Sequence, residues 1–466
     1  MQKAILAKYI LCKGAFTMIK KIITLLLCVA MLLSVACLAG CDDEKGGNNG
    51  ANNGGTSATN EDDFFLDVPS ELRGTTVQFA TWIDHSATDT AICLQGFEED
   101  TGMDIELVQV NESDYIQKVT ALIAADQSPD AVVENGDFPK TLNILMPLEV
   151  ETTGLDVKDP FWNQGIVERF TIGDYSYLVN GANSSWDIVG AMTYYNKTIL
   201  EENGITSPAE LMEQNNWNVD SMWTLMEQIK GACGFSRPGT SITFEDWLAA
   251  YGGAQIRWDT KTDKFVSSIK EENTKKAIDY MMRAQDAGLA KIIPNHDDDI
   301  AKGNIALQIC GAYGLRKSPG WFYTMDIDDL GFAPLPKINK DDADYPYTAH
   351  IRAYGLCKGS KNPKGGAFFL RYFLNEDHYD INQIFKNEEA KKMYMELRQK
   401  QDPERISVTI GVVNVTDPSG SSVSMVKDLI NGTSAQVSVN LEKAYNTCVA
   451  YVEAANKIVE DVVAEQ

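Results

Sequence analysis

The chain has 466 residues, 44% of them hydrophobic, which is enough to form a sizeable core and two or three domains and excludes a disordered chain. Its formal net charge is −25, and residues 1–40 contain five lysines and no acid. The part from Cys41 onward therefore has 36 basic and 66 acidic residues, or −30. A surface this acidic repels polyanions, so nucleic acid is excluded as an expected partner.

Residues 18–41 have the order of a secretory signal peptide. Met18 is followed by Lys20 and Lys21, then by an apolar run from Ile22 to Leu38 and the small residues before Cys41. Leu38-Ala39-Gly40-Cys41 resembles a bacterial lipobox, in which the cysteine becomes the lipidated first residue. The alternative is an uncleaved helix that spans the membrane, since the run is long enough to do so.

A polar tether is predicted after the signal peptide. Residues 41–63 are rich in Gly, Asn and Asp and are unsuited to a packed core. We therefore expect residues 1–40 to be removed, Met18 to be the true start, and Cys41 to hold the folded body on the extracellular face of the cell membrane.

The body carries no pattern of a metal, cofactor or nucleophile site. Its five cysteines are widely spaced and form no C-x-x-C, which favours buried free thiols. Asp297-Asp298-Asp299 lacks the spacing of a calcium loop, and no phosphate-binding or serine-nucleophile motif is present. We expect no metal and no cofactor.

The body opens with strands and helices in alternation. Strands are predicted over 74–82, 103–110 and 131–133, with amphipathic helices over 91–98 and 115–125 between them. This order is typical of a parallel βαβ sheet. The second half is richer in helix, with helices predicted over 220–231, 273–287, 364–374, 388–399 and 441–463. The sequence thus indicates an α/β body of two lobes.

Short motifs in a fixed order run through most of the body. They include Gly96-Phe97-Glu98, Pro129-Asp130, Tyr195-Asn196-Lys197, Tyr251-Gly252-Gly253, Ala301-Lys302-Gly303, Gly331-Phe332-Ala333-Pro334 and Lys358-Gly359-Ser360-Lys361-Asn362-Pro363. In this order the chain resembles the family 1 extracellular solute-binding proteins, the superfamily of maltose-binding protein.

The resemblance implies a two-lobe periplasmic-binding-protein-like fold with a cleft and about three hinge crossings. The expected lobes are 64–188 with 350–408, and 189–349 with 409–466. The crossings are expected near 187–191, 336–349 and 406–413. It further implies a monomeric, non-enzymatic receptor that closes over a small ligand and delivers it to an ABC permease. We expect this ligand to be a carbohydrate.

Candidate ligand-binding residues of the first lobe follow strand ends or lie near the first crossing. Trp82, Asp84 and His85 follow the first strand, Asp137 follows the third, and Trp186 precedes the crossing. Aromatic rings stack on the C–H faces of sugars while carboxylates bind the hydroxyls. Core packing is the alternative for Trp82, and hinge packing is the alternative for Trp186.

Candidate residues of the second lobe and its border are Phe244, Trp247, Tyr313, Arg316 and Arg352. Tyr313 stands where many members of the family have a tryptophan. Core burial is the alternative for Trp247, and a surface or inter-lobe ion pair is the alternative for the arginines. Converging arginines would indicate a carboxylate or phosphate on the ligand.

Two further classes of protein stay open at this stage. Glu245-Asp246 is interpreted as a solvated face, but a surface-tethered carbohydrate-active hydrolase would need a pair of cleft carboxylates, which sequence does not exclude. A structural or adhesive lipoprotein is the third class, and the ordered loops at the expected cleft argue against it.

Overall fold

The computed structural model describes most of the chain from Val68 onward. The described residues are 68–85, 90–111, 114–134, 138–182, 190–259, 261–293, 299–315, 325–326, 328–347, 352–379, 385, 387–399, 429 and 431–466, apart from the side chains of 313 and 397–399. The predicted signal peptide, with Cys41 and the tether, lies outside them. Within these ranges no helix combines the length and the apolar character that crossing a bilayer requires.

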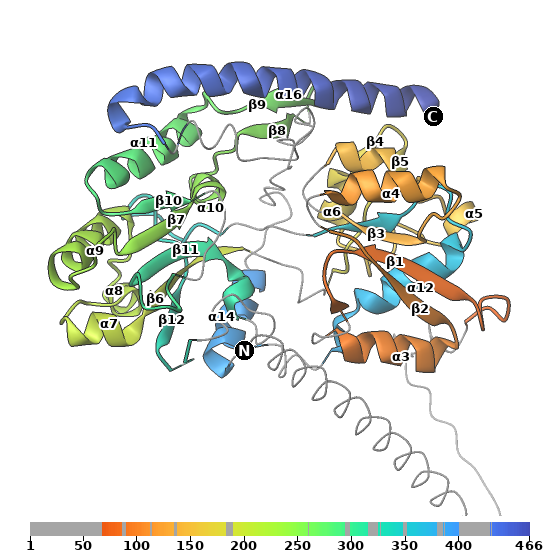
Figure 1. The fold of residues 1–466 in the computed structure, drawn as a ribbon, viewed down its shortest axis with the longest axis horizontal. Coiled ribbons are helices and arrows are strands. Elements are labelled where there is room, and N and C mark those ends of the chain that lie inside the picture. The colour runs from red at the N-terminus through yellow and green to blue at the C-terminus, as the bar shows by residue number, and fades with distance from the viewer. Residues whose placement is uncertain are drawn as a thin grey trace, which may run out of the picture. The chain divides into compact units, whose positions relative to one another are not determined.

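The first lobe contains a four-stranded sheet with the order β13-β3-β1-β2 (Figure 1). The strands are β1 (Thr76–Thr81), β2 (Asp104–Gln109), β3 (Ala131–Val133) and β13 (Tyr354–Leu356). β1 pairs in parallel with both β2 and β3, and β13 runs antiparallel to β3. The predicted strands and their parallel arrangement are confirmed.

Helices complete the first lobe. They are α3 (Ala91–Thr101), α4 (Tyr115–Ala124), α5 (Val150–Thr153), α6 (Gln164–Arg169) and α12 (Pro363–Phe373). The lobe also contains a 3-10 turn, η4 (Lys140–Asn143), and a hairpin of two short strands, β4 (Thr171–Ile172) and β5 (Tyr175–Ser176). α12 packs against β1, β3 and β13, and its Phe369 and Phe373 rings lie 5.1 and 5.5 Å from the ring of Phe79. The core of this lobe therefore lies between α12 and the sheet.

Asp130, just before β3, explains why α12 starts where it does. Its carboxylate accepts hydrogen bonds from Gln78 N at 2.9 Å, Ser360 Oγ at 2.6 Å and Asn362 N at 3.0 Å. Asn362 in turn caps α12 through Gly365 N. The motif around Asn362 thus joins the returning chain to the first sheet.

The second lobe contains a five-stranded sheet with the order β10-β7-β11-β6-β12. Its strands are β6 (Ala191–Asn196), β7 (Thr240–Thr243), β10 (Lys291–Ile293), β11 (Leu307–Gly311) and β12 (Leu330–Ala333). β10 and β11 are parallel to β7, whereas β6 is antiparallel to its neighbours β11 and β12. The carboxyl ends of β7, β10 and β11 therefore share one edge.

The helices of the second lobe are α7 (Lys197–Glu202), α8 (Pro208–Glu213), α9 (Val219–Ala232), α10 (Phe244–Ala250) and α11 (Glu272–Asp286), with the 3-10 turn η5 (Ala312–Leu315) after β11. The helices predicted over 220–231, 273–287 and 364–374 match α9, α11 and α12 within one residue at each end. Asn218 caps α9 with its side chain, and Ser207 caps α8 in a capping box.

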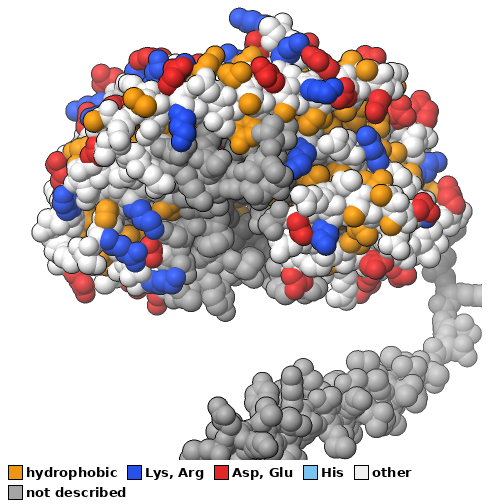
Figure 2. Space-filling view, turned by 45° about the horizontal axis from the view of Figure 1, so that its top comes forward, with side chains coloured by type: hydrophobic (Ala, Val, Ile, Leu, Met, Phe, Trp, Pro, Cys, Tyr) orange, Lys and Arg blue, Asp and Glu red, His pale blue; other side chains and the backbone are white. Residues whose placement is uncertain are grey.

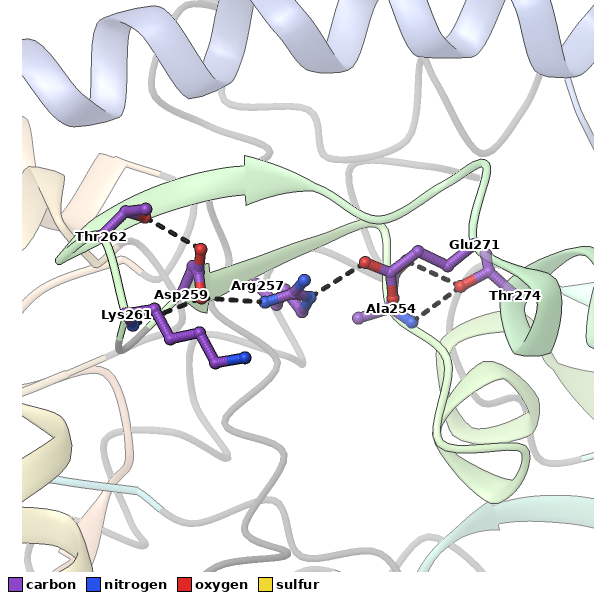
Figure 3. Close-up of polar contacts among 7 residues, drawn as sticks. All are labelled: Ala254, Arg257, Asp259, Lys261, Thr262, Glu271 and Thr274. Carbon is purple, nitrogen blue, oxygen red and sulfur yellow. Dashed lines mark hydrogen bonds and ion pairs between the residues drawn. The ribbon is translucent and has the colours of Figure 1, made fainter.

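A hairpin of β8 (Ile256–Asp259) and β9 (Lys264–Ser267) follows α10. Figure 3 shows the ion pairs that hold its first strand in place. Arg257 Nη1 lies 3.7 Å from Asp259 Oδ1, and Arg257 Nε lies 3.0 Å from Glu271 Oε1, just before α11. Beside it, the backbone of Ala254 makes two hydrogen bonds with Thr274 Oγ1 at the start of α11. The segment between Ala254 and Arg257 is thus anchored on both sides.

The chain ends in a 3-10 turn η9 (Ser434–Gln436) and the 29-residue helix α16 (Val437–Glu465), which lies over the β8–β9 hairpin in Figure 1. Asn456 accepts from Phe265 N at 2.8 Å and donates to Phe265 O at 3.0 Å. At the far end Gln466 Nε2 donates to Ile172 O at 2.9 Å. α16, which the sequence assigned to the second lobe, therefore contacts elements of both lobes.

The helix α14 (Glu388–Gln399) also differs from the expected division of the chain. It packs against β12 and η5, and Glu389 pairs with Lys197 at 3.3 Å. Residues 388–399 thus belong with the second sheet, although the sequence placed 350–408 in the first lobe. The segment 334–337 still pairs with the second lobe, because Pro334 O accepts from Trp217 Nε1. The expected crossings near 187–191 and 406–413 lie largely or wholly outside the described residues.

The surface and the cysteines agree with the composition. Figure 2 shows Asp and Glu side chains spread over the described surface, with Lys and Arg among them. All five body cysteines are free thiols, and only Cys233 is not fully buried. No group of His, Cys, Asp and Glu among the described residues could hold a metal ion.

Candidate functional site

What we call the first half-site consists of Trp82 and Asp84, which follow β1, and Arg352, which precedes β13. Asp84 is exposed. Trp82 follows β1 directly and is half-buried. Its ring is packed edge-on by Tyr115, at 5.3 Å and 84°, and the guanidinium of Arg352 lies 5.7 Å from its centroid. Trp82 is therefore held by two neighbours while part of its surface remains open, as an aromatic ligand platform requires.

Tyr115 also joins the ends of two parallel strands. Its hydroxyl donates to Ala80 O at 2.8 Å and accepts from Val133 N at 3.2 Å. The loops that leave β1 and β3 therefore start from a fixed position at the carboxyl edge of the sheet, where open α/β sheets bind ligands.

Arg352 is held through its backbone by the buried side chain of Asn180, whose Nδ2 donates to Arg352 O at 2.6 Å. Val179 and Tyr354 next to them exchange two backbone hydrogen bonds of 2.8 Å. The segment at residues 179–180 and the chain that enters β13 are thus paired, and Arg352, next to Trp82, stands at this junction.

His85, predicted to bind ligand, is buried in the core. It is 1% exposed, lies against the rings of Phe79 and Phe373, and bonds to Thr81 Oγ1 at 3.2 Å and Thr90 Oγ1 at 2.9 Å. Burial, followed by the charge of Arg352, lowers its pKa to about 3, so the imidazole is neutral near pH 7. Its position is that of a core residue, and direct ligand contact stays a prediction.

Glu134 is a buried loop anchor. Its Oε1 accepts from Phe138 N at 3.0 Å and from Thr141 Oγ1 at 3.4 Å. The carboxylate thereby ties together the two sides of the loop after β3. With only 6% of its surface exposed, Glu134 is not part of a solvated turn.

Four predicted residues cannot be placed. Asp137, Trp186 and Arg316 lie outside the described residues, and of Tyr313 only the backbone is described, in η5 after β11. Their contacts with ligand remain predictions.

Phe244 and Trp247 of α10 are completely buried. The ring of Trp247 packs on Tyr280 at 4.9 Å and on Tyr251 at 5.7 Å. This burial favours core packing, the alternative weighed for Trp247, over a place at the rim of the lobe. The reason is the helical spacing, which turns both side chains toward α11 and the sheet.

Glu245 and Asp246, which lie between these two aromatic residues, form a second half-site together with Thr243 and Gln255. Glu245 and Asp246 begin α10 immediately after β7, at the carboxyl edge of the second sheet. Both are half-buried, contrary to the solvated face that the sequence suggested. Gln255, 6% exposed, donates from Nε2 to Glu245 Oε1 at 3.0 Å.

Loss of solvation perturbs both carboxyl groups. Burial raises the pKa of Glu245, against the opposing effect of the hydrogen bond from Gln255. Burial, followed by the charge of Glu245, raises the pKa of Asp246 to about 7. Two adjacent carboxyl groups with raised pKa values at a strand end are a common feature of functional sites. The signal available in sequence was their place directly after a β-branched strand.

The comparisons with known proteins agree with this architecture. Residues 94–381, more than half of the chain, match the sequence profile described as bacterial extracellular solute-binding protein. Among curated protein sequences none matches.

Solved structures of the same fold include three from other bacteria. The galacto-N-biose/lacto-N-biose I-binding protein of an ABC transporter from Bifidobacterium longum, in complex with lacto-N-biose, has 15% identity and a TM-score of 0.60 over 82% of this chain and 98% of that one. A solute-binding protein from Agrobacterium radiobacter in complex with ribitol has 14% identity and a TM-score of 0.57 over 83% and 99%.

A third, from Mycobacterium tuberculosis in complex with glycerophosphocholine, has 16% identity and a TM-score of 0.55 over 81% and 99%. At these identities the structures support the fold, and they confirm the two-lobe α/β class expected from the sequence. The family is assigned from the profile match: the chain belongs to the bacterial extracellular solute-binding proteins, which bind solutes rather than convert them.

Proposed function

We propose that the protein is a lipid-anchored receptor that captures a carbohydrate outside the cell and delivers it to an ABC permease. The observation that supports a carbohydrate ligand is the position of Trp82 at the carboxyl edge of the first sheet. Tyr115 packs edge-on against its ring, and Arg352 lies beside it. An aromatic face beside fixed polar groups suits the apolar C–H face and the hydroxyls of a sugar.

The two solved relatives in complex with lacto-N-biose and ribitol support the same class of ligand. Cys41 in its lipobox-like sequence and the polar tether up to residue 63 support the anchor. We propose that the body acts as a monomer and that ligand is enclosed when the two lobes close.

The competing hydrolase is disfavoured by the family and by the arrangement of the carboxyl groups. Glycoside hydrolysis needs an acid and a second carboxylate on opposite sides of the scissile bond. Glu245 and Asp246 are neighbours in one helical turn, and Glu134 is engaged by the backbone of its own loop.

A thermal-shift screen of the purified protein with monosaccharides, oligosaccharides and polyols tests this function. A ligand present at 100 times its Kd adds about 2.7 kcal/mol to the free energy of unfolding. We expect at least one sugar to raise the melting temperature and to be recovered unchanged by chromatography. Stabilisation by no sugar or polyol contradicts the carbohydrate proposal, and recovery of a cleaved sugar contradicts the receptor.

A further inference from the structure

The second half-site is rich in hydrogen-bond acceptors that have no donor. Asp246 makes no hydrogen bond and no ion pair with any part of the described chain, although it is half-buried. Glu245 receives one hydrogen bond, from Gln255, and has no cationic partner among the described residues. A half-buried carboxylate without a counter-charge is costly, so a group that supplies positive charge or donors would stabilise this site.

Gln255 independently indicates that hydrogen-bond donors are missing at this site. Its side chain is more than nine-tenths buried, and its Oε1 has no hydrogen-bond partner although its Nε2 is bound to Glu245 at 3.0 Å. The two atoms belong to one amide, so the unpartnered oxygen lies close to the Glu245 carboxylate. Thr243 Oγ1, at the start of α10, is also buried without a partner.

The backbone holds this amide in place. Gln255 O accepts from Ser268 N at 2.9 Å, and its neighbours Ala254 and Arg257 are anchored to Thr274 and Glu271 (Figure 3). The backbone on both sides of Gln255 is thus fixed, and no group of the described chain donates to its Oε1.

We propose that the second half-site recognises a protonated amine, so that the preferred ligand is a carbohydrate bearing an amino group. An ammonium offers three donors and no acceptor, which complements Asp246, Glu245 and Gln255 Oε1 in charge and in hydrogen bonding. A neutral hydroxyl supplies one donor and leaves both carboxyl groups without a counter-charge. The inference rests on the function proposed above and names the class of ligand.

Three disaccharides with one skeleton separate amine recognition from sugar recognition. They are the β-1,4-linked glucosamine disaccharide, its di-N-acetyl form and cellobiose, and binding to the full purified chain is measured by calorimetry at fixed ionic strength. We expect the diamino sugar to bind at least about tenfold more tightly than the other two, the order expected for a charge-assisted contact.

Asp246→Asn removes the ionisable carboxyl group without changing the shape of the side chain. It should reduce the preference for the diamino sugar by about tenfold and change the affinity for cellobiose by less than about threefold. Asp341→Asn, at an exposed carboxylate with no hydrogen-bond or ion-pair partner in the described chain, is the matched control and should leave both affinities unchanged. If Asp246→Asn does not fold, Glu245→Gln takes its place with the same expectation.

The two proposals fail in different ways. Equal affinity for the three disaccharides, binding of neutral sugars alone, or a preference unchanged in Asp246→Asn would overturn amine recognition and leave the sugar receptor standing. If no sugar or polyol of the wider screen binds, the proposed function itself is overturned.

Discussion

The guanidinium of Arg352 lies 5.7 Å from the ring centroid of Trp82, which joins the loop after the first strand to the chain that returns into the same sheet. Asn180 fixes the backbone of Arg352, and Tyr115 packs edge-on against the indole. Because these neighbours hold the indole in one position, a ligand can stack on it without paying much ordering entropy.

Trp82→Ala should weaken binding of the cognate sugar by about 1–3 kcal/mol, the cost of removing a central aromatic anchor. The fold should survive, because Trp82 is only half-buried. Trp223→Ala is the control, since Trp223 is also half-buried but packs on Tyr280 in the second lobe. Calorimetry measures the affinity of both variants for the cognate sugar. Equal affinities of the two variants would mean that Trp82 is a packing residue.

Tyr313→Ala should weaken binding by a similar amount, about 1–3 kcal/mol, if Tyr313 is the stacking aromatic of the second lobe. Circular dichroism on the variant establishes that it is folded before its affinity is measured. Binding as tight as that of the wild type would remove Tyr313 from the site.

His85 should make the protein less stable in acid. The pKa of an unfolded histidine is near 6.5, whereas that of native His85 is lowered to about 3. Above pH 6.5 both states carry neutral imidazole. As the pH falls from 6.5 towards 3, only the unfolded state takes up the proton. The free energy of unfolding therefore falls by roughly a few kcal/mol.

The measurement is urea unfolding of wild type and His85→Asn over this pH range, with the expectation that the difference between them shrinks as the pH falls. Proton NMR of the His85 ring is a direct control. A titration of that ring near pH 6.5 would contradict the burial argument.

Asp246 should have the opposite effect. Its native pKa is raised to about 7 from a usual value near 3.8, so between these values the unfolded state is ionised while the native state keeps the proton. The free energy of unfolding attributable to this residue therefore falls as the pH rises from about 4 to about 7. In Asp246→Asn this component should vanish, while Asp341→Asn should follow the wild type. Identical pH profiles of all three proteins would mean that Asp246 is well solvated.

Asn456 should contribute to stability through its two hydrogen bonds with the backbone of Phe265. Asn456→Leu removes both and leaves a backbone donor and acceptor unpaired, which should cost about 2 kcal/mol of unfolding free energy. Asn446→Leu is the control on the exposed side of the same helix. Urea denaturation that shows equal stability for the two variants would mean that α16 is not held to β9 through this pair.

Cys41→Ala should release the protein from the membrane while leaving ligand affinity unchanged, because the predicted anchor and the half-sites lie on different segments. Fractionation of cells and mass spectrometry of the amino-terminal residue measure the first effect, and calorimetry measures the second. A membrane-bound, unlipidated Cys41→Ala protein would support the uncleaved signal-anchor helix instead.

Much of the fold could be read from local spacing. The alternation of strand and helix over 74–133, and the helices now seen as α9, α11, α12 and α14, depend on hydrophobic periods and caps within a few residues, so sequence predicts them. Trp82 was likewise placed at a strand end by the order of residues alone.

Tertiary structure decided which side chains face a site and which face the core. Trp82 and His85 follow the same strand, yet one is half-open and the other is enclosed by Phe79 and Phe373. Phe373 comes from α12, which is distant from this strand in the sequence. Gln255 reaches Glu245 only because α10 ends and the chain turns back between them. Such contacts depend on long-range packing, which no local pattern encodes, and they determine desolvation, pKa values and therefore the chemistry that the half-sites can perform.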